Sequence, residues 1–201
     1  MGWGIRSRVP HKKVNLELGS NAPLIVNHDG DWETAADKAQ IHAFSHAGQS
    51  CISIQRILLH EDIADQFIER LVTNMESLTV GDPLSEDTDV GPLITPGDRD
   101  RVKEWIDEAV AGGGKVLTGG ELVDEGRCLA PTLIEHPDRK ANVWCEEIFG
   151  PVATVDRFSD ETGVCPAGFN TTALPAAIAG PSLWATRFSG KLNGLIAPTT
   201  P

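Results

Sequence analysis

The sequence predicts an α/β fold with a mostly parallel open sheet flanked by helices. Short apolar segments with strand character alternate with longer segments of helical periodicity, and this alternation is typical of parallel sheets. The chain has 201 residues, of which 40% are hydrophobic and 23% charged. These values suit one globular domain with a sizeable core, with or without an appendage.

The first half of the chain supplies two strand regions and two helices. Residues 14–26 hold apolar clusters on both sides of a Gly-Ser-Asn-Ala-Pro turn, which predicts strand, turn and strand. Asp31 is a candidate N-cap for a helix over about 32–46. Residues 56–60 predict a further strand. An amphipathic helix over 62–78 is predicted from five apolar residues at helical spacing: Ile63, Phe67, Leu71, Met75 and Leu78.

The second half continues the alternation. Residues 81–94 are rich in Asp, Pro and Gly and predict a loop. A second amphipathic helix over about 95–111 is indicated by Val102, Trp105, Ile106, Ala109 and Val110. Three glycines at 112–114 end that helix. Short strands are predicted near residues 116–118, 132–134 and 152–155.

The composition changes near residue 160. Of the 40 residues from 162 to 201, 23 are Ala, Pro, Thr or Gly, and no helical or strand period persists there. We therefore expect residues 1–160 to form a partial domain and residues 161–201 to form an irregular tail, such as a frameshift would produce.

Charge and cysteine usage exclude several classes of function. The net charge of −12 disfavours nucleic acid and anionic membranes, which both require clustered Lys and Arg. No apolar run reaches the roughly 20 residues that span a bilayer, and the N-terminus lacks a secretory signal. The four cysteines have no metal-type spacing, so we expect no metal site. We interpret them as reduced thiols of a cytoplasmic protein, with a disulfide as the alternative.

Three segments carry candidate chemistry. Glu17 lies in residues 14–23 (VNLELGSNAP), Cys51 lies in residues 44–52 (FSHAGQSCI), and a third segment spans residues 145–152 (CEEIFGPV). In this order and at these separations, they resemble the signatures of the aldehyde dehydrogenase superfamily. The stretches 81–84, 89–93 and 130–133 add to the resemblance, which covers about residues 2–158.

The resemblance implies a fold, a reaction and a site. The fold is an aldehyde dehydrogenase catalytic domain, incomplete in this chain, and the reaction oxidises a small-molecule aldehyde with NAD or NADP. By resemblance Cys51 is the nucleophile and Glu17 the base. Glu147 contacts the nicotinamide-side ribose, and Phe149 packs near it. The resemblance also implies a homo-oligomer, an assembly in doubt for this fragment.

These residue types suit that reaction. A thiolate attacks the aldehyde carbon, loss of hydride leaves a thioester, and a carboxylate activates the water that releases the acid. The resemblance assigns the oxyanion to the cysteine backbone N–H and an upstream asparagine. The flanking Leu16 and Leu18 predict that Glu17 lies in a partly buried loop, where burial would raise its pKa toward the range of a general base.

Each residue also has a plainer interpretation. Taken alone, Cys51 could be a packed thiol, Glu17 a solvated carboxylate and Glu147 a surface charge. His46 lies five residues before Cys51, which raises a Cys–His hydrolase as an alternative. Two further hypotheses are a non-catalytic fragment that associates with full-length subunits and a cofactor-free esterase that uses Cys51.

The chain departs from the family pattern in its extent and in its motifs, where Ser53 and Gln55 differ from the commonest family residues after the cysteine. Ser20 stands where the family usually has a glycine, and a positive φ there would strain a serine. The family's cofactor domain precedes the Glu17 segment, so the resemblance places most of the dinucleotide site upstream of Met1. We therefore expect little or no dehydrogenase activity from this chain alone.

Overall fold

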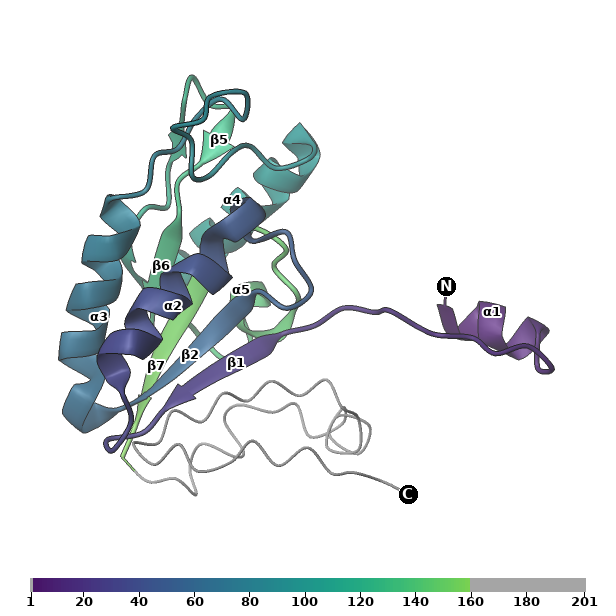
Figure 1. Ribbon diagram of the computed structural model, residues 1–201, viewed down its shortest axis with the longest axis horizontal. Helices are drawn as coiled ribbons and strands as arrows, with labels where there is room; N and C mark the ends of the chain where they lie inside the picture. Colours follow the sequence, from purple (N-terminus) through teal and green to yellow (C-terminus); the bar gives the residue numbers. More distant parts are fainter. Residues whose placement is uncertain (1, 160–201) are drawn as a thin grey trace.

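The computed structural model describes residues 2–159, which form a three-layer α/β/α domain with a projecting N-terminal arm (Figure 1). The central sheet has the strand order β1-β2-β7-β6-β3. Strands β1, β2, β7 and β6 are parallel, and β3 pairs with β6 in the antiparallel sense. The bounds are β1 (Ala22–Val26), β2 (Ile54–His60), β7 (Val152–Phe158), β6 (Thr132–Glu135) and β3 (Lys115–Thr118). The predicted mostly parallel open sheet is confirmed.

Helices cover both faces of this sheet. They are α2 (Trp32–Phe44), α3 (Glu61–Glu76), α4 (Pro96–Ala111) and α5 (Asn142–Cys145). Successive strand residues point to opposite faces. In β7, Ala153 and Val155 accordingly join the core formed with α2 and α3, whereas Val152 joins the core formed with α4 and α5. The alternation of strands and helices in the sequence therefore produces two apolar layers, one on each side of the sheet.

Side chains before the helices fix where they begin. The Asp31 carboxylate accepts a hydrogen bond from the Thr34 N–H at 3.1 Å, and the Thr95 hydroxyl accepts one from the Asp98 N–H at 3.1 Å. Pro96 occupies the first turn of α4, where its missing N–H costs nothing. Both helices therefore begin within a residue of the predicted positions.

The prediction of two strands in residues 14–26 is wrong in its first half. Only Ala22–Val26 is a strand, and residues 9–21 cross to it without regular structure. A strand needs a hydrogen-bonding neighbour, and no strand within residues 2–159 pairs with residues 14–20. Shorter elements were not predicted: η1 (Ser45–Gly48), β4 (Leu122–Val123), β5 (Cys128–Leu129) and α5. Segments of two to four residues are too short to display a period.

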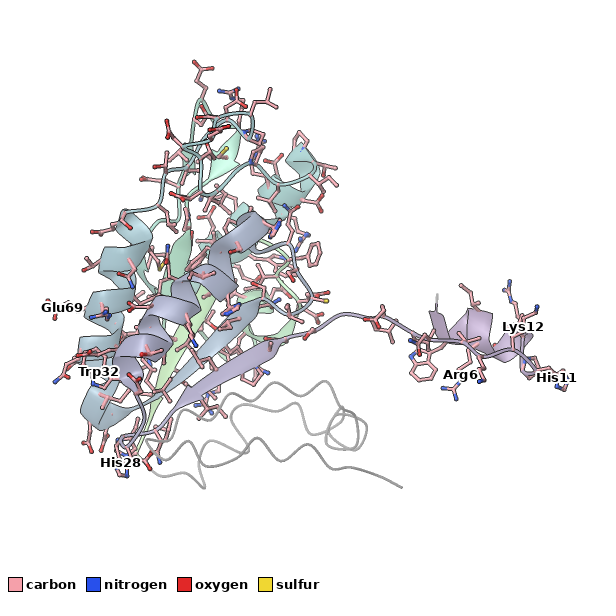
Figure 2. The ribbon with its side chains drawn as sticks, in the orientation of Figure 1. Arg6, His11, Lys12, His28, Trp32 and Glu69 are labelled. Atoms are coloured by element: carbon pink, nitrogen blue, oxygen red, sulfur yellow. The ribbon has the colours of Figure 1, made fainter. Side chains whose placement is uncertain are left out.

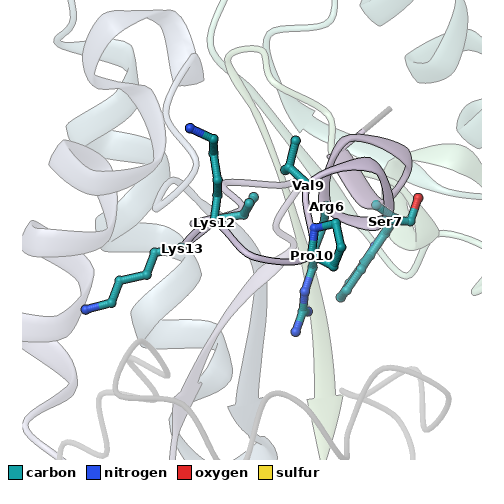
Figure 3. Close-up of a pocket in the computed structure, with 8 residues that line it drawn as sticks. Arg6, Ser7, Val9, Pro10, Lys12 and Lys13 are labelled. Atoms are coloured by element: carbon teal, nitrogen blue, oxygen red, sulfur yellow. The ribbon is translucent and has the colours of Figure 1, made fainter.

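The N-terminal arm consists of α1 (Gly2–Arg8) and the segment that follows it. Helix α1 has no buried residue, and Arg6, His11 and Lys12 extend away from the sheet and its helices (Figure 2). A hollow lies within the arm itself, where it is lined by Trp3, Arg6, Ser7, Val9, Pro10, Lys12, Lys13 and Val14 (Figure 3). The arm contributes nothing to the two apolar layers.

The domain boundary proposed at residue 160 and the tail over 161–201 lie outside the described residues. Among residues 2–159, no helix has the length and apolar character required to cross a membrane.

An ion pair between α2 and α3 makes stability depend on pH. Asp37 accepts two hydrogen bonds from the Arg70 guanidinium, at 2.7 and 2.8 Å, and one from the Asn74 amide at 2.9 Å. The Arg70 bonds are the main cause that lowers the Asp37 pKa to about 2. Because the folded-state pKa lies below the unfolded value of about 3.9, this contribution is present above pH ~4 and is lost as the pH falls toward ~2.

Urea unfolding of the wild type and of Asp37→Asn should therefore differ near neutral pH and converge as the pH falls from ~4 to ~2. Glu69→Gln, at an exposed carboxylate of α3 (Figure 2), serves as the control and should show no such convergence. A gap between wild type and Asp37→Asn that stays constant down to pH ~2 would contradict the assignment.

Candidate active site

The three motif segments meet at one edge of the sheet. The Glu17 segment leads into β1, the Cys51 segment into β2 and the Glu147 segment into β7. These three strands are adjacent and parallel, so all of them begin at the same edge (Figure 1). Parallel pairing therefore brings segments that are far apart in the sequence to one place in the fold.

A left-handed turn aims the chain toward Cys51. After α2 ends, His46, Ala47 and Gly48 have φ angles of 55°, 54° and 69°. Residues other than glycine seldom adopt such angles, and they do so mainly where the surrounding structure demands it. Gly48 has a second constraint, since a Cβ atom there would collide with the Gly150 carbonyl oxygen. The turn therefore sets the Cys51 loop directly against the segment that carries Glu147.

Cys51 itself is exposed at the surface, while its loop is anchored on both sides. The buried Ser53 hydroxyl donates to the Ala43 carbonyl at 3.0 Å, and the Gln49 side-chain oxygen accepts from the Ile94 N–H at 3.0 Å. Within residues 2–159 the Cys51 thiol makes no hydrogen bond, and its backbone N–H has no protein acceptor. The prediction that Cys51 sits on a loop after the helix is confirmed.

Glu17 is exposed, so the predicted partly buried loop is wrong. Leu18 is 50% exposed, because the segment runs from the projecting arm and not between two paired strands. Two residues beyond Glu17, the backbone touches the third segment: a Cβ on Gly19 would lie 2.9 Å from a carboxylate oxygen of Glu147. The lack of a side chain at Gly19 therefore permits this close approach.

Glu147 and Phe149 lie on the irregular segment between α5 and β7. Glu147 is half-buried against Gly19, and Phe149 is 39% exposed with a φ of 50°. The Arg101 guanidinium of α4 donates to the Ile148 carbonyl at 2.9 Å and holds this segment from its other side. The exposed Phe149 ring is therefore two residues from the Glu147 carboxylate in the sequence.

Two buried residues of β2 were not predicted as part of the site. The Gln55 and Arg56 side chains are 2% and 8% exposed, and they bond to the Glu17 segment through Ser20 and Asn21. Burial lowers the pKa of Arg56. The available signal was two consecutive long polar residues at the start of an apolar strand, since such residues are seldom buried without a partner.

His46, Cys128 and Cys145 make no hydrogen bond to Glu17, Cys51 or Glu147 within residues 2–159. His46 is exposed, and no hydrogen bond joins it to Cys51 within the described residues. Cys51, Cys128 and Cys145 are free thiols, while Cys165 lies outside the part of the chain that the structure describes. Burial raises the pKa of both Cys128 and Cys145.

Two further expectations concern metal and Ser20. No group of three or more His, Cys, Asp or Glu side chains within residues 2–159 could hold a metal ion. Ser20 is not among the described residues with positive φ, so the strain considered for it does not arise.

Comparison with known proteins gives a consistent result. The model of the aldehyde dehydrogenase family matches residues 4–180. The 3-sulfolactaldehyde dehydrogenase of Priestia aryabhattai is 39% identical over 160 residues, which are 80% of this chain and 33% of that protein. The glutarate-semialdehyde dehydrogenase of Pseudomonas putida is 42% identical over 153 residues, covering 76% of this chain and 32% of the relative. The chain thus spans about a third of these curated relatives.

Solved structures agree. Aldehyde dehydrogenase 21 of Physcomitrella patens, in complex with the reaction product succinate, superposes with a TM-score of 0.77 and 38% identity, over 84% of this chain and 35% of that one. Betaine aldehyde dehydrogenase of Staphylococcus aureus, in complex with NAD+, gives a TM-score of 0.74 and 32% identity over 83% and 34%.

Substitution of Gly48 should destabilise the fold more than substitution of another glycine that has a positive φ but open space around it. Gly48→Ala adds a steric clash with Gly150 to the cost of a positive φ, so we expect a loss of about 2 kcal/mol or more in the free energy of unfolding. Gly113 is the matched control, because its φ is 99° and nothing lies within 4 Å of an added Cβ. Gly113→Ala should lose about 1 kcal/mol of the free energy of unfolding, the cost of a side chain at a positive φ alone. Equal losses in urea unfolding would refute the contact.

Proposed function

This chain belongs to the aldehyde dehydrogenase family, and on that premise we propose that its three converging segments form a centre that oxidises an aldehyde to a carboxylic acid with NAD(P)+. One observation carries the proposal: Glu17, Cys51 and Glu147 all precede the amino ends of adjacent parallel strands. A reaction that needs a nucleophile, a base and a cofactor contact requires such groups to be held close together.

Cys51 is the nucleophile in this proposal. Its thiolate attacks the aldehyde carbon, and the carbonyl oxygen takes the negative charge. Two features support the role: the thiol is exposed on an anchored loop, and the Cys51 backbone N–H has no protein acceptor within residues 2–159. A free N–H beside the attacking sulfur can donate to the oxyanion.

The nicotinamide cofactor would meet Glu147 and Phe149. A carboxylate accepts hydrogen bonds from ribose hydroxyls, and an exposed ring beside it can pack on a sugar, so this pair fits the ribose at the nicotinamide end of NAD(P). When bound, NAD(P)+ supplies the hydride acceptor of the oxidation. Cys51 then holds the acyl group as a thioester.

Glu17 completes the reaction as the base. It takes a proton from a water molecule that attacks the thioester carbon, the acid is released, and the Cys51 thiolate leaves. The exposed position of Glu17 gives it access to water, and the contact of Gly19 with Glu147 keeps its segment at the same sheet edge.

We also propose a compartment and partners. Three free thiols among the described residues support a reducing, cytoplasmic location. A small-molecule aldehyde is the proposed substrate, and a homo-oligomer is the proposed assembly of the complete enzyme. Size-exclusion chromatography with light scattering measures the assembly directly.

The acyl half of the reaction can be tested without a dinucleotide. The chain should release p-nitrophenol from p-nitrophenyl acetate through an acyl thioester on Cys51, visible by mass spectrometry. Cys51→Ala should form no thioester, whereas Cys145→Ala, at another free thiol, should retain it. In Glu17→Gln the thioester should persist, because loss of a general base slows its hydrolysis by about a hundredfold or more.

Other outcomes identify the alternatives. Rapid ester hydrolysis that continues in Glu17→Gln but stops in Cys51→Ala would favour a cofactor-free esterase. Absence of any thioester on Cys51 would contradict the proposed nucleophile and would favour a non-catalytic fragment.

The redox half is measured by NAD(P)H absorbance with an aldehyde. We expect the 201-residue chain alone to form little or no NAD(P)H. Robust formation that disappears in Cys51→Ala would overturn that expectation while supporting the proposed roles.

A further inference from the structure

Gln55 makes hydrogen bonds with two of the three converging segments. Its side-chain oxygen accepts from the Ile148 N–H at 3.0 Å, one residue after Glu147. Its side-chain nitrogen donates to the Ser20 carbonyl at 3.5 Å, three residues after Glu17. Gln55 itself lies on β2, four residues after Cys51. A single amide thus connects the backbones of the Glu17 and Glu147 segments.

The packing of β2 alone does not require an amide here. Ile57 and Leu59 follow on the same face of the strand and join the apolar core with α2 and α3. Gln55 is 2% exposed, and burial of an amide is costly unless it is hydrogen-bonded. An apolar residue would meet the packing need at lower cost, so the paired amide points to a role in holding the two segments.

Arg56 reinforces the same junction from the other face of β2. Its guanidinium donates to the Asn21 carbonyl at 2.8 Å, and the Asn21 side chain donates to the Trp144 carbonyl at 2.8 Å. The Arg56 guanidinium also lies 5.9 Å from the centre of the Trp144 ring. Gln55 and Arg56 therefore bond to the consecutive carbonyls of Ser20 and Asn21. Gln55 also bonds to Ile148, and Asn21 bonds to Trp144, so both connections reach the region that precedes β7.

We propose that Gln55 is a positioning residue: its amide fixes the spacing between the segment that carries Glu17 and the segment that carries Glu147 and Phe149. Gln55 acts through Ser20 and Ile148 and contacts neither substrate nor cofactor. The meaning of this spacing for catalysis rests on the proposed function, but the spacing itself can be measured without turnover.

Three variants separate the amide's role from ordinary packing. Gln55→Met keeps the side-chain length and removes both hydrogen bonds. Gln55→Glu retains both while its buried carboxyl group is protonated, and loses the donor to Ser20 when the group ionises. Thr154→Val is the matched control, since the fully buried Thr154 hydroxyl donates to the Gln55 carbonyl at 3.0 Å but to neither motif segment.

Hydrogen–deuterium exchange of the full chain reports the positioning. In Gln55→Met, we expect exchange roughly tenfold faster than wild type at Ile148, whose N–H loses its acceptor, and in β1 (Ala22–Val26), whose entry from Ser20 loosens. In Thr154→Val these two regions should exchange as in the wild type, even if its thermal midpoint falls as far as that of Gln55→Met.

Gln55→Glu adds a second readout, the pH dependence of hydrogen exchange, which would not change if Gln55 served only for packing. Compared with the wild type at each pH, exchange in β1 (Ala22–Val26) should be normal at acidic pH and faster as the buried carboxyl group ionises. The Gln55→Met effect should not depend on pH in this way.

The ester assay separates this inference from the proposed function. If Gln55 positions the base, Gln55→Met should slow thioester hydrolysis at least tenfold more than thioester formation. Changed exchange without any thioester would support positioning and contradict the proposed chemistry. The positioning role is overturned if Gln55→Met and Thr154→Val give the same exchange in both regions, or if exchange in Gln55→Glu follows the wild type at every pH.

Discussion

Parallel pairing of β1, β2 and β7 is the constraint on which the rest of the structure depends. Backbone hydrogen bonds fix the register of these strands, and the shared direction places all three amino ends at one edge. Helices α2 and α3 lie in the connections between the strands and cover one face of the sheet, so the same pairing also creates the main apolar core. The site is a consequence of topology before any side chain is considered.

Binding sites of open parallel sheets usually lie beyond the carboxyl ends of the strands. In this chain the candidate groups gather at the opposite edge, on the segments that enter the strands. Two glycines make this close packing possible: Gly48 lies against the Gly150 carbonyl, and Gly19 lies against the Glu147 carboxylate, so neither position has room for a side chain. Close packing of three irregular segments there substitutes for the rigidity that a strand end would provide.

The sequence predicted the helices and strands, which have periodic patterns, and did not predict features that depend on tertiary contacts. Helices α2, α3 and α4 follow from periodicity and from caps such as Asp31, and the strands follow from short apolar runs. The prediction that Glu17 is partly buried was wrong, because Leu16 and Leu18 indicate a buried segment only when another layer covers them. Gln55 was missed as a bridge because its partners, Ser20 and Ile148, are backbone groups, which leave no signature in residue types.

The left-handed turn at His46–Gly48 has a consequence for protein engineering. Position 48 needs a glycine because the Gly150 carbonyl oxygen of the opposite loop lies where a Cβ atom would be, while a Cβ atom at Gly150 would itself meet Val102 of α4. The positions of the two loops are therefore set together. A library that diversifies the Cys51 loop alone would sample mostly variants that no longer fit the loop across from it. Loops transplanted between homologues should therefore be exchanged together, as one cassette made of two distant stretches of the gene.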